Sequence, residues 1–300
     1  MTNEEKDKIK TDLEAMNKRA KINFIVCLIL AILFGILIFT LSSDLFFAIF
    51  IAIFIAVIFN VALSVSIKKK YKDEIVPKIL KKFLGDDIVY EPKGRFDKEL
   101  LRDLNFFPCT TYSGEDMISG IYKGIKFTTA DISMTHQSGG KNSTTVTDFK
   151  GCMWVFEYNN KTINSRIDLY EKDYLKRHSL RKNGLEKVEF EDIDFNNKIK
   201  TYASNAHDAF YVITPQIIDR LKNNINNISG DILYSIQENK LYLVISSSKN
   251  RMEFKRFRNN YEELIESLKE DVSPILETIK QFDLKGEEKE EIWKIENLNL

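Results

Sequence analysis

The side chains that could carry acid–base or metal chemistry are scattered along this chain. Its three histidines, His136, His178 and His207, are isolated, and none belongs to an HxxxH or HExxH zinc-binding pattern. A surface position or a structural hydrogen bond explains each of them without catalysis. The three cysteines form no CxxC pair, which suits a reducing compartment and predicts neither a disulfide framework nor a metal site.

Phosphate-binding and nucleophile motifs give no clearer signal. Residues 139–143 (GGKNS) combine glycine, lysine and serine, but they lack the spaced glycines and the strand-to-helix context of a phosphate loop. The chain has no GxSxG nucleophile elbow. We therefore expect no catalytic residue, no cofactor and no metal, and the sequence favours a protein that is not an enzyme.

Two charged stretches carry alternatives. The acidic run 189–194 could hold a cation or do acid–base work, although a solvated face is the more usual role of such a run. Basic and aromatic residues interleave over 251–258, which could contact anionic lipid or RNA, or could be a loop between a strand and a helix. Because 44 basic residues balance 44 acidic ones, no general attraction to nucleic acid is expected.

Two long apolar runs, Ile22–Leu41 and Leu45–Ile67, are the most evident structural elements of the chain. Three residues separate them. At about 1.5 Å per residue, a helix of about 20 residues crosses the hydrocarbon core of a bilayer, roughly 30 Å thick. The acidic residues before the first run are atypical of a signal peptide. The sequence therefore predicts a transmembrane helical hairpin that is retained.

The basic residues predict the orientation of this hairpin. Lys18, Arg19 and Lys21 precede the first run, a lysine cluster follows the second, and the connecting turn has no positive charge. By the positive-inside rule, both termini are expected in the cytoplasm. The lysines expected to contact the membrane surface are Lys68, Lys69, Lys70, Lys72, Lys78, Lys81 and Lys82.

Small residues predict how the two helices pack. In a hairpin that turns near Ser43, residues at equal depth have numbers that sum to about 87, by the constant rise of a helix. This rule pairs Ala31 with Ala56 and Gly35 with Ala52, where small side chains allow close approach in lipid. It also brings Asn60 near Cys27. Asn60 could mark a transport path, but an interhelical hydrogen bond is the favoured role.

The segments on either side of the hairpin are predicted as helices. Residues 1–21 carry a narrow apolar stripe and are either a solvated lead-in or a surface for another protein. Residues 68–84 form a basic amphipathic connector, which either lies in the headgroup region or packs on the following domain. Pro77 argues against a straight continuation of the membrane helix.

The rest of the chain predicts a cytosolic α+β domain over 85–284, made of antiparallel hairpins and helices, followed by a charged tail over 285–300. Hairpins are expected around 123–124, 159–161 and 238–239. Thr214 and Pro215 predict a helix start, and Pro274 is expected to restart the last helix behind Ser273.

Three blocks of this domain resemble the DUF3137 family: residues 188–195 (VEFEDIDF), 199–203 (IKTYA) and 207–215 (HDAFYVITP). Residues 119–124 (SGIYKG) and the two-span anchor fit the same pattern, so the resemblance extends over roughly 85–260, with Thr201 in place of the usual valine-like residue. The resemblance implies a bacterial protein of the inner membrane, encoded near LemA-type membrane proteins. It supplies no catalytic residue.

Three functions follow from these expectations. The leading hypothesis is a non-enzymatic, membrane-anchored binding or scaffold domain in a bacterial membrane protein complex, in contact with membrane lipid and with a protein partner, for which a LemA-type protein is a candidate. The second is a membrane-tethered enzyme acting on lipid or a membrane protein, with a polar site under the 137–145 loop. The third is a channel or transporter subunit made of hairpins that form a homo-oligomer. No nucleic-acid partner is expected.

Overall fold

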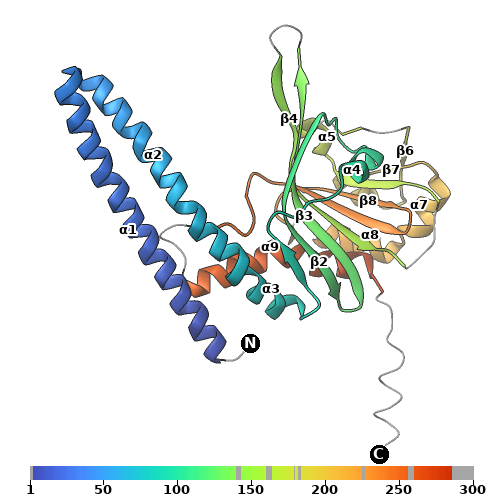
Figure 1. Cartoon of the computed structure of the whole chain (residues 1–300). Helices are drawn as coiled ribbons and strands as arrows, with labels where there is room; N and C mark the ends of the chain where they lie inside the picture. The colour runs from blue at the N-terminus through green and yellow to red at the C-terminus, as the bar shows by residue number, and fades with distance from the viewer. Residues whose placement is uncertain are drawn as a thin grey trace, which may run out of the picture. The chain divides into compact units, whose positions relative to one another are not determined.

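The computed structural model describes residues 3–139, 143–159, 164–178, 180–181, 184–224, 227–255 and 260–285. Packing divides the chain into two compact units (Figure 1). The helical unit comprises Met1–Phe83 and Met252–Lys269, and the sheet unit comprises Leu84–Arg251 and Glu270–Leu300. The described residues of 252–269 therefore pack with the two N-terminal helices, although they follow the sheet in the sequence.

Two long antiparallel helices dominate the helical unit, α1 (Asn3–Ser42) and α2 (Leu45–Lys70) (Figure 1). The lead-in and the first apolar run form one continuous helix. The chain reverses at Ser43, which has a φ of 55°, and Asp44 caps α2 by accepting a hydrogen bond from the Phe47 N–H at 3.0 Å.

Both helices are long and apolar enough to cross a membrane. The most apolar window of each is mostly exposed, with 11% of the residues buried in α1 and 6% in α2. A core helix of a soluble domain would bury most of such a window, since burial of apolar side chains drives folding in water. The exposure therefore favours a lipid environment for these two windows.

As expected from Pro77, the helix after the apolar run does not continue as one regular α-helix. A π-helical turn, η1 (Tyr71–Ile75), leads directly into α3 (Val76–Leu84). Proline lacks an N–H and its ring crowds the carbonyl four residues earlier, and the wider π turn accommodates such a defect. The chain thus continues as an irregular helix. The apolar face of α3, including Ile79 and Leu80, is buried in the protein, which disfavours the headgroup region as its location.

The apolar stripe of the lead-in segment is also buried, with Ile9 and Leu13 each 1% exposed. Nearby, the ammonium groups of Lys6 and Lys10 lie over the Tyr261 ring, and Lys10 pairs with Glu262 at 3.6 Å. The stripe is therefore neither solvated nor available to another protein, because the helical unit itself covers it.

The sheet unit confirms the α+β fold. Its antiparallel sheet has nine strands in the order β1-β2-β3-β4-β9-β8-β5-β7-β6. The strands are β1 (Val89–Glu91), β2 (Thr111–Tyr122), β3 (Ile125–Ser138), β4 (Thr144–Glu157), β5 (Ile167–Glu171), β6 (Glu186–Val188), β7 (Ile199–Ala203), β8 (Asp231–Gln237) and β9 (Lys240–Ser246).

Two of the three predicted hairpins are confirmed. β2 and β3 turn through Lys123 and Gly124, and β8 and β9 turn through Glu238 and Asn239, all four with positive φ. The hairpin predicted around 159–161 is wrong, because β4 pairs with β3 and β9 whereas β5 pairs with β7 and β8. Alternation identified both strands, but it carries no information about which strand lies beside which.

Short helices connect the strands: α4 (Lys98–Leu104), α5 (Tyr174–Arg177), α6 (Ile193–Lys198), α7 (Ala206–Val212) and α8 (Pro215–Asn224). α8 begins at Pro215 as predicted, and the Thr214 hydroxyl accepts a hydrogen bond from the Ile217 N–H at 3.4 Å. One face of the sheet packs on α4 through an aromatic cluster that includes Phe106, Phe149 and Tyr242. Tyr234, on the opposite face, contacts Phe282.

The last helix, α9 (Tyr261–Phe282), passes through Pro274 without a break, so the predicted restart there is wrong. Pro274 cannot donate to the Glu270 carbonyl, as a helical N–H at this position would. The Ser273 hydroxyl donates to that carbonyl instead, at 2.9 Å. This replacement bond explains why the helix tolerates an internal proline.

Candidate functional site

The main candidate site of the sheet unit is a recess of about 330 Å³ beside the second half of α9. One wall comes from the middle of β3 and β4 and from the end of β9 with the residues after it, and the other from α9 and the turn before β8. The polar and charged side chains that line it are Asp131, Asn227, Ser229, Ser247, Lys249, Arg251, Glu270, Asp271 and Ser273. Its volume is within the range of small-ligand pockets.

A buried ion pair forms the base of this recess. Arg251 is 6% exposed, and its Nε donates to Asp131, which also accepts the Arg251 backbone N–H at 3.3 Å. Its Nη2 donates to the Thr129 hydroxyl at 3.3 Å, and its guanidinium lies 5.2 Å from the centre of the Trp154 ring. The carboxylate and the ring together compensate a cation that burial alone would destabilise.

A second pair lies at the rim. The Lys249 ammonium contacts the Asp271 carboxylate at 2.9 Å and the Glu270 carboxylate at 3.4 Å. Burial opposes the charged form of Lys249, but its hydrogen bonds to the two carboxylates outweigh this effect and raise its pKa. Lys249 therefore remains an ammonium and is not available as a base.

Cys152 also lines the recess, and burial raises the pKa of its thiol despite the neighbouring guanidinium of Arg251. Burial disfavours the charged form of Arg251, yet the nearby Cys152 and Asp131 keep its pKa above the usual value. A nucleophile or a general base needs a pKa shifted toward neutrality. In Cys152, Lys249 and Arg251 the shifts run the other way, so none of these three side chains is activated.

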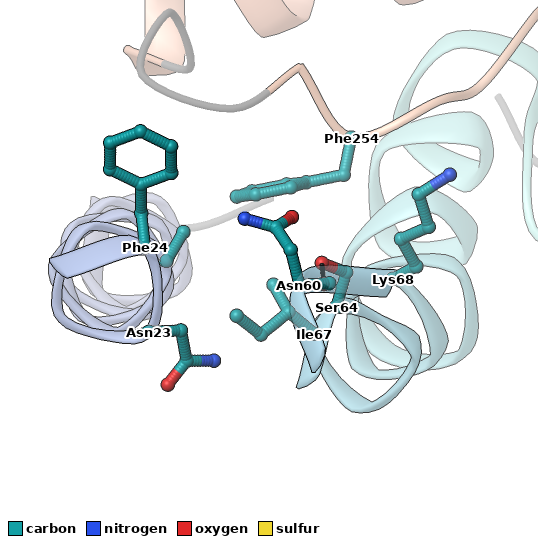
Figure 2. Close-up of a pocket in the computed structure, with 8 residues that line it drawn as sticks. Asn23, Phe24, Asn60, Ser64, Ile67, Lys68 and Phe254 are labelled. Atoms are coloured by element: carbon teal, nitrogen blue, oxygen red, sulfur yellow. Dashed lines mark hydrogen bonds between the residues drawn. The ribbon is translucent and has the colours of Figure 1, made fainter. Parts of the chain in front are cut away.

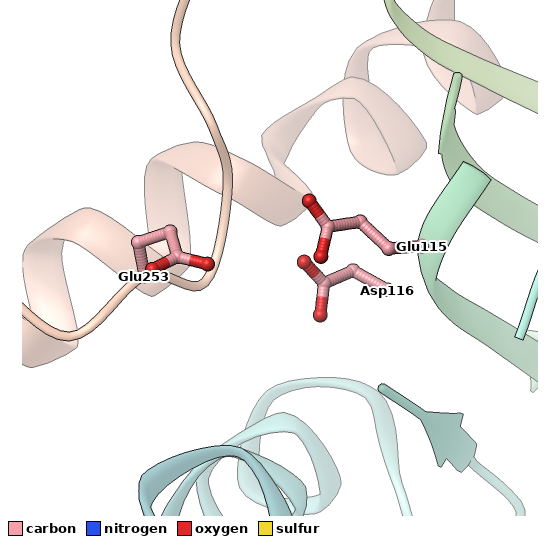
Figure 3. A group of neighbouring side chains, drawn as sticks. All are labelled: Glu115, Asp116 and Glu253. Carbon is pink, nitrogen blue, oxygen red and sulfur yellow. The ribbon is translucent and has the colours of Figure 1, made fainter. Parts of the chain in front are cut away.

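A smaller hollow of about 210 Å³ adjoins the recess and shares Asp131 and Lys249 with it. β2 borders this hollow at a bulge between Glu115 and Ile118. Asp116 has a φ of 56° there, and Figure 3 shows Glu115 and Asp116 on the same side of β2. Asp116 is buried and accepts a hydrogen bond from the Tyr90 hydroxyl, so it stabilises the bulge, whereas Glu115 lines the hollow.

Two of the three histidines and Asp192 of the acidic run have structural partners. His136 contacts Asp148 at 2.6 Å and His178 contacts Asp231 at 2.9 Å, and neither pair lines the recess. In the acidic run, Asp192 caps α6 and binds Lys222 at 2.7 Å. These contacts agree with the structural reading of both features.

Two residues of the basic-aromatic stretch are buried, and part of the stretch lies outside the described residues. Arg251 and Phe254 are both 6% exposed, Arg251 in the sheet unit and Phe254 against Tyr71 in the helical unit. Arg256, Phe257 and Arg258 lie outside the described residues, as do Gly140–Asn142 of the predicted polar loop and Trp293 of the tail.

In the helical unit, α1 and α2 approach closely at the small residues. A Cβ built on Gly35 would lie 3.2 Å from the Ala52 Cβ, and Ala31 is 8% exposed, while Ala56 is partly buried. Figure 2 shows the Asn60 side chain extending toward the Phe254 ring, at a gap that is lined also by Asn23, Ser64 and Lys68. The Asn23 amide donates to the Leu63 carbonyl at 3.4 Å, which joins the two helices.

The lysines after the second apolar run fall into two groups. Lys68 and Lys72 both bind the Glu253 carboxylate, at 3.1 and 3.0 Å, and Lys72 is 8% exposed. Lys70 lies near Asp12 and Glu74. The side chains of Lys69, Lys78, Lys81 and Lys82 are exposed.

Sequence reasoning missed the recess because its two central charges, Asp131 and Arg251, lie 120 residues apart. A signal was present, however. Asp131 lies between Ala130 and Ile132 in β3, whereas Arg251 follows the polar residues 246–250 and gives no such signal. A charge in an apolar context is most often paired when buried.

Comparison with known proteins adds a family and one distant fold. Residues 147–284 match the family described as "Protein of unknown function (DUF3137)", a shorter range than the resemblance seen in the sequence, which began near 85. None of the curated proteins matches the chain. The chain is similar to the crystal structure of the mycobacterial trehalose monomycolate transport factor A, TtfA, at 12% identity and a TM-score of 0.37, over 70% of this chain and 93% of that one.

Proposed function

We propose that this chain, whose residues 147–284 belong to the DUF3137 family, is a membrane-anchored binding protein without catalytic activity. Its α1–α2 hairpin inserts into the bacterial inner membrane, with both termini in the cytoplasm, as the positive-inside rule predicts from the lysines beside each span. The exposed apolar windows of both helices support insertion.

The observation that carries the binding function is the electrostatic state of the recess. Asp131 neutralises Arg251 and Asp271 neutralises Lys249, which leaves the Glu270 carboxylate in excess. Asn227 donates to Glu277 at 3.2 Å and Ser247 accepts the Lys249 N–H at 3.1 Å, so this carboxylate and the Ser229 hydroxyl are the groups offered to a ligand. Both accept hydrogen bonds, which suits the N–H groups of a peptide segment. We infer that the occupant is a segment of a membrane protein in the same complex, for which a LemA-type protein is the first candidate.

Native mass spectrometry of the full chain, co-expressed with a LemA-type protein and extracted gently from its membranes, tests this function. Ser229 is exposed at the recess, so Ser229→Trp can fill the recess while leaving the core of the sheet unit intact. The matched control is Glu99→Trp, at an exposed position of α4. We expect a second polypeptide in fixed stoichiometry with the wild type and the control, and its loss with Ser229→Trp.

Equal retention of the partner by both variants would reject the recess as the binding site. A homo-oligomer that contains no second polypeptide would reject the adaptor function and favour self-assembly through the hairpin.

The volume of the recess favours one alternative, a membrane-tethered enzyme that acts on lipid or a membrane protein. Lys249 is the residue to test, since it is the cation at the rim. Lys249→Met would abolish turnover in an enzyme that uses this ammonium, whereas a binding protein would show no turnover with either variant.

A further inference from the structure

The β3–β4 hairpin extends beyond the strands on either side of it, and the proposed function makes no use of this end of the sheet (Figure 1). β2 pairs with β3 only up to Thr135, and β9 pairs with β4 only from Gly151. At this end, residues 135–138 of β3 pair with residues 144–147 of β4. We call this two-stranded segment the arm.

One side of β4 is open along the arm. Residues 144–147 are all exposed, and Val146 is 40% exposed. Among the residues that the structure describes, the last main-chain hydrogen bond on this side of β4 joins the Ser247 N–H to the Lys150 carbonyl at 3.0 Å. The main-chain groups of the arm on this side therefore face solvent, with no neighbouring strand.

The register identifies which residues face this open side. The Thr135 carbonyl accepts a hydrogen bond from the Thr110 N–H at 2.9 Å, so Thr135 directs its main-chain groups toward β2. Residues that lie opposite each other in an antiparallel pair either bond each other or both face away. Thr147, opposite Thr135, therefore directs its N–H and C=O to the open side, as does Thr145 two residues earlier.

The two outer edges of the sheet are built differently. β1 has three residues and is followed by Pro92, and β6 has three residues, of which Glu186 and Lys187 are charged. Short strands, proline and charge prevent an edge from pairing with another chain. The open side of the arm has none of these protections. Residues 144–147 (TTVT) are uncharged and β-branched, which favours strand pairing.

The composition of this edge favours a second copy of the chain as its occupant. Identical edges pair without repulsion when they carry no charge, and residues 144–147 carry none. In an antiparallel pairing of two copies, Val146 lies opposite itself and Thr145 lies opposite Thr147, and threonine pairs are favourable cross-strand neighbours. A two-stranded ribbon alone is at best marginally stable, and such pairing joins the two arms into one four-stranded segment.

We propose that the chain forms a dimer in which the open sides of two arms pair, with Val146 of both copies at the two-fold axis. Each Thr145–Thr147 pair exchanges both main-chain hydrogen bonds, and the symmetry supplies two such pairs. An interface of a few residues a side binds weakly, so we expect an equilibrium between monomer and dimer. This inference concerns self-association and does not rest on binding at the recess.

Disulfide cross-linking of the full chain in its own membranes tests the pairing. In a chain without the native cysteines, Val146→Cys places two cysteines opposite each other in a non-hydrogen-bonded pair, where the Cα atoms are about 4.5 Å apart. This separation suits a disulfide. Ser138→Cys is the control, because it is exposed in the same arm but lies on β3, away from the open side. We expect a cross-linked dimer with Val146→Cys and a monomer with Ser138→Cys.

Charges at the paired threonines test the register. In the Val146→Cys chain, Thr145→Lys with Thr147→Lys places like charges opposite each other in both pairs. Each like-charged pair weakens the association by roughly threefold, so the association constant should fall about tenfold. Thr145→Glu with Thr147→Glu should have the same effect alone. Co-expression of the lysine and glutamate chains, which differ in mass, should restore cross-linking as a mixed dimer.

Equal cross-linking of Val146→Cys and Ser138→Cys, or failure of the two charged chains to form the mixed dimer, would overturn the pairing. A disulfide from Val146→Cys to a different polypeptide would assign this edge to a partner protein instead of a second copy. A dimer that persists undiminished in the lysine variant would place self-association elsewhere in the chain. The fluorescence of the buried Trp154 in each variant checks that the sheet remains folded.

Discussion

The Asp131–Arg251 pair offers the sharpest perturbation of the recess. Asp131→Ala leaves Arg251, which is 6% exposed, without the carboxylate that accepts both its Nε–H and its backbone N–H. Removing one partner of a buried ion pair costs about 3–5 kcal/mol, because the remaining charge is uncompensated. We therefore expect the free energy of unfolding of the sheet unit to fall by about 3 kcal/mol or more.

Trp154 reports this change directly, since its ring is fully buried and lies 5.2 Å from the Arg251 guanidinium. Tryptophan fluorescence during urea titration of the detergent-solubilised chain, in a Trp293→Phe background, gives the free energy of unfolding. The double variant Asp131→Leu with Arg251→Met removes both charges and should lie within about 1 kcal/mol of the wild type. A loss below about 1 kcal/mol for Asp131→Ala would refute the view that this pair is buried and mutually dependent.

Three further predictions follow from single contacts. Burial alone would raise the pKa of Glu253, but hydrogen bonds from Lys72 and Lys68 lower this pKa below its ordinary value of 4.5. The docking of residues 252–255 should therefore be stable at pH values above the unfolded-state pKa of Glu253 and weaken as the pH falls through the folded-state pKa. Hydrogen exchange of this segment measures the weakening, and Glu253→Gln should remove its pH dependence. Ser273→Ala, which removes the bond to the carbonyl that Pro274 leaves, should cost about 0.5–1.5 kcal/mol in thermal unfolding. A Cβ at Gly35 would lie 3.2 Å from the Ala52 Cβ, so Gly35→Leu should separate α1 from α2. This separation should reduce disulfide cross-linking between engineered cysteines at Ala31→Cys and Ala56→Cys, whereas the control Leu33→Ala should leave the cross-linking unchanged.

Local patterns predicted much of the fold. The apolar runs gave α1 and α2, the Thr214–Pro215 cap gave the start of α8, and the turn residues gave two hairpins. Each of these features depends on neighbours within a few residues, which sequence reasoning can assess.

The features that were not predicted depend on distant contacts. The placement of β9 beside β4 pairs residues 95 positions apart, Gly151 with Ser246, and no local pattern encodes it. Pro274 was expected to restart the last helix, but the Ser273 hydroxyl binds the Glu270 carbonyl that Pro274 leaves without a helical N–H. The recess was missed for the same reason as the strand order, since Asp131 and Arg251 meet only after the sheet forms.

Cysteine labelling of intact cells tests the central claim, that α1 and α2 insert as a hairpin and leave the sheet unit in the cytoplasm. In a chain without the native cysteines, a membrane-impermeant maleimide should label Ser43→Cys, at the turn between the helices, in intact cells. Glu99→Cys, at an exposed position of α4, should be labelled only after the cells are broken. Labelling of Glu99→Cys in intact cells, or equal protection of both positions until the cells are broken, would contradict the account.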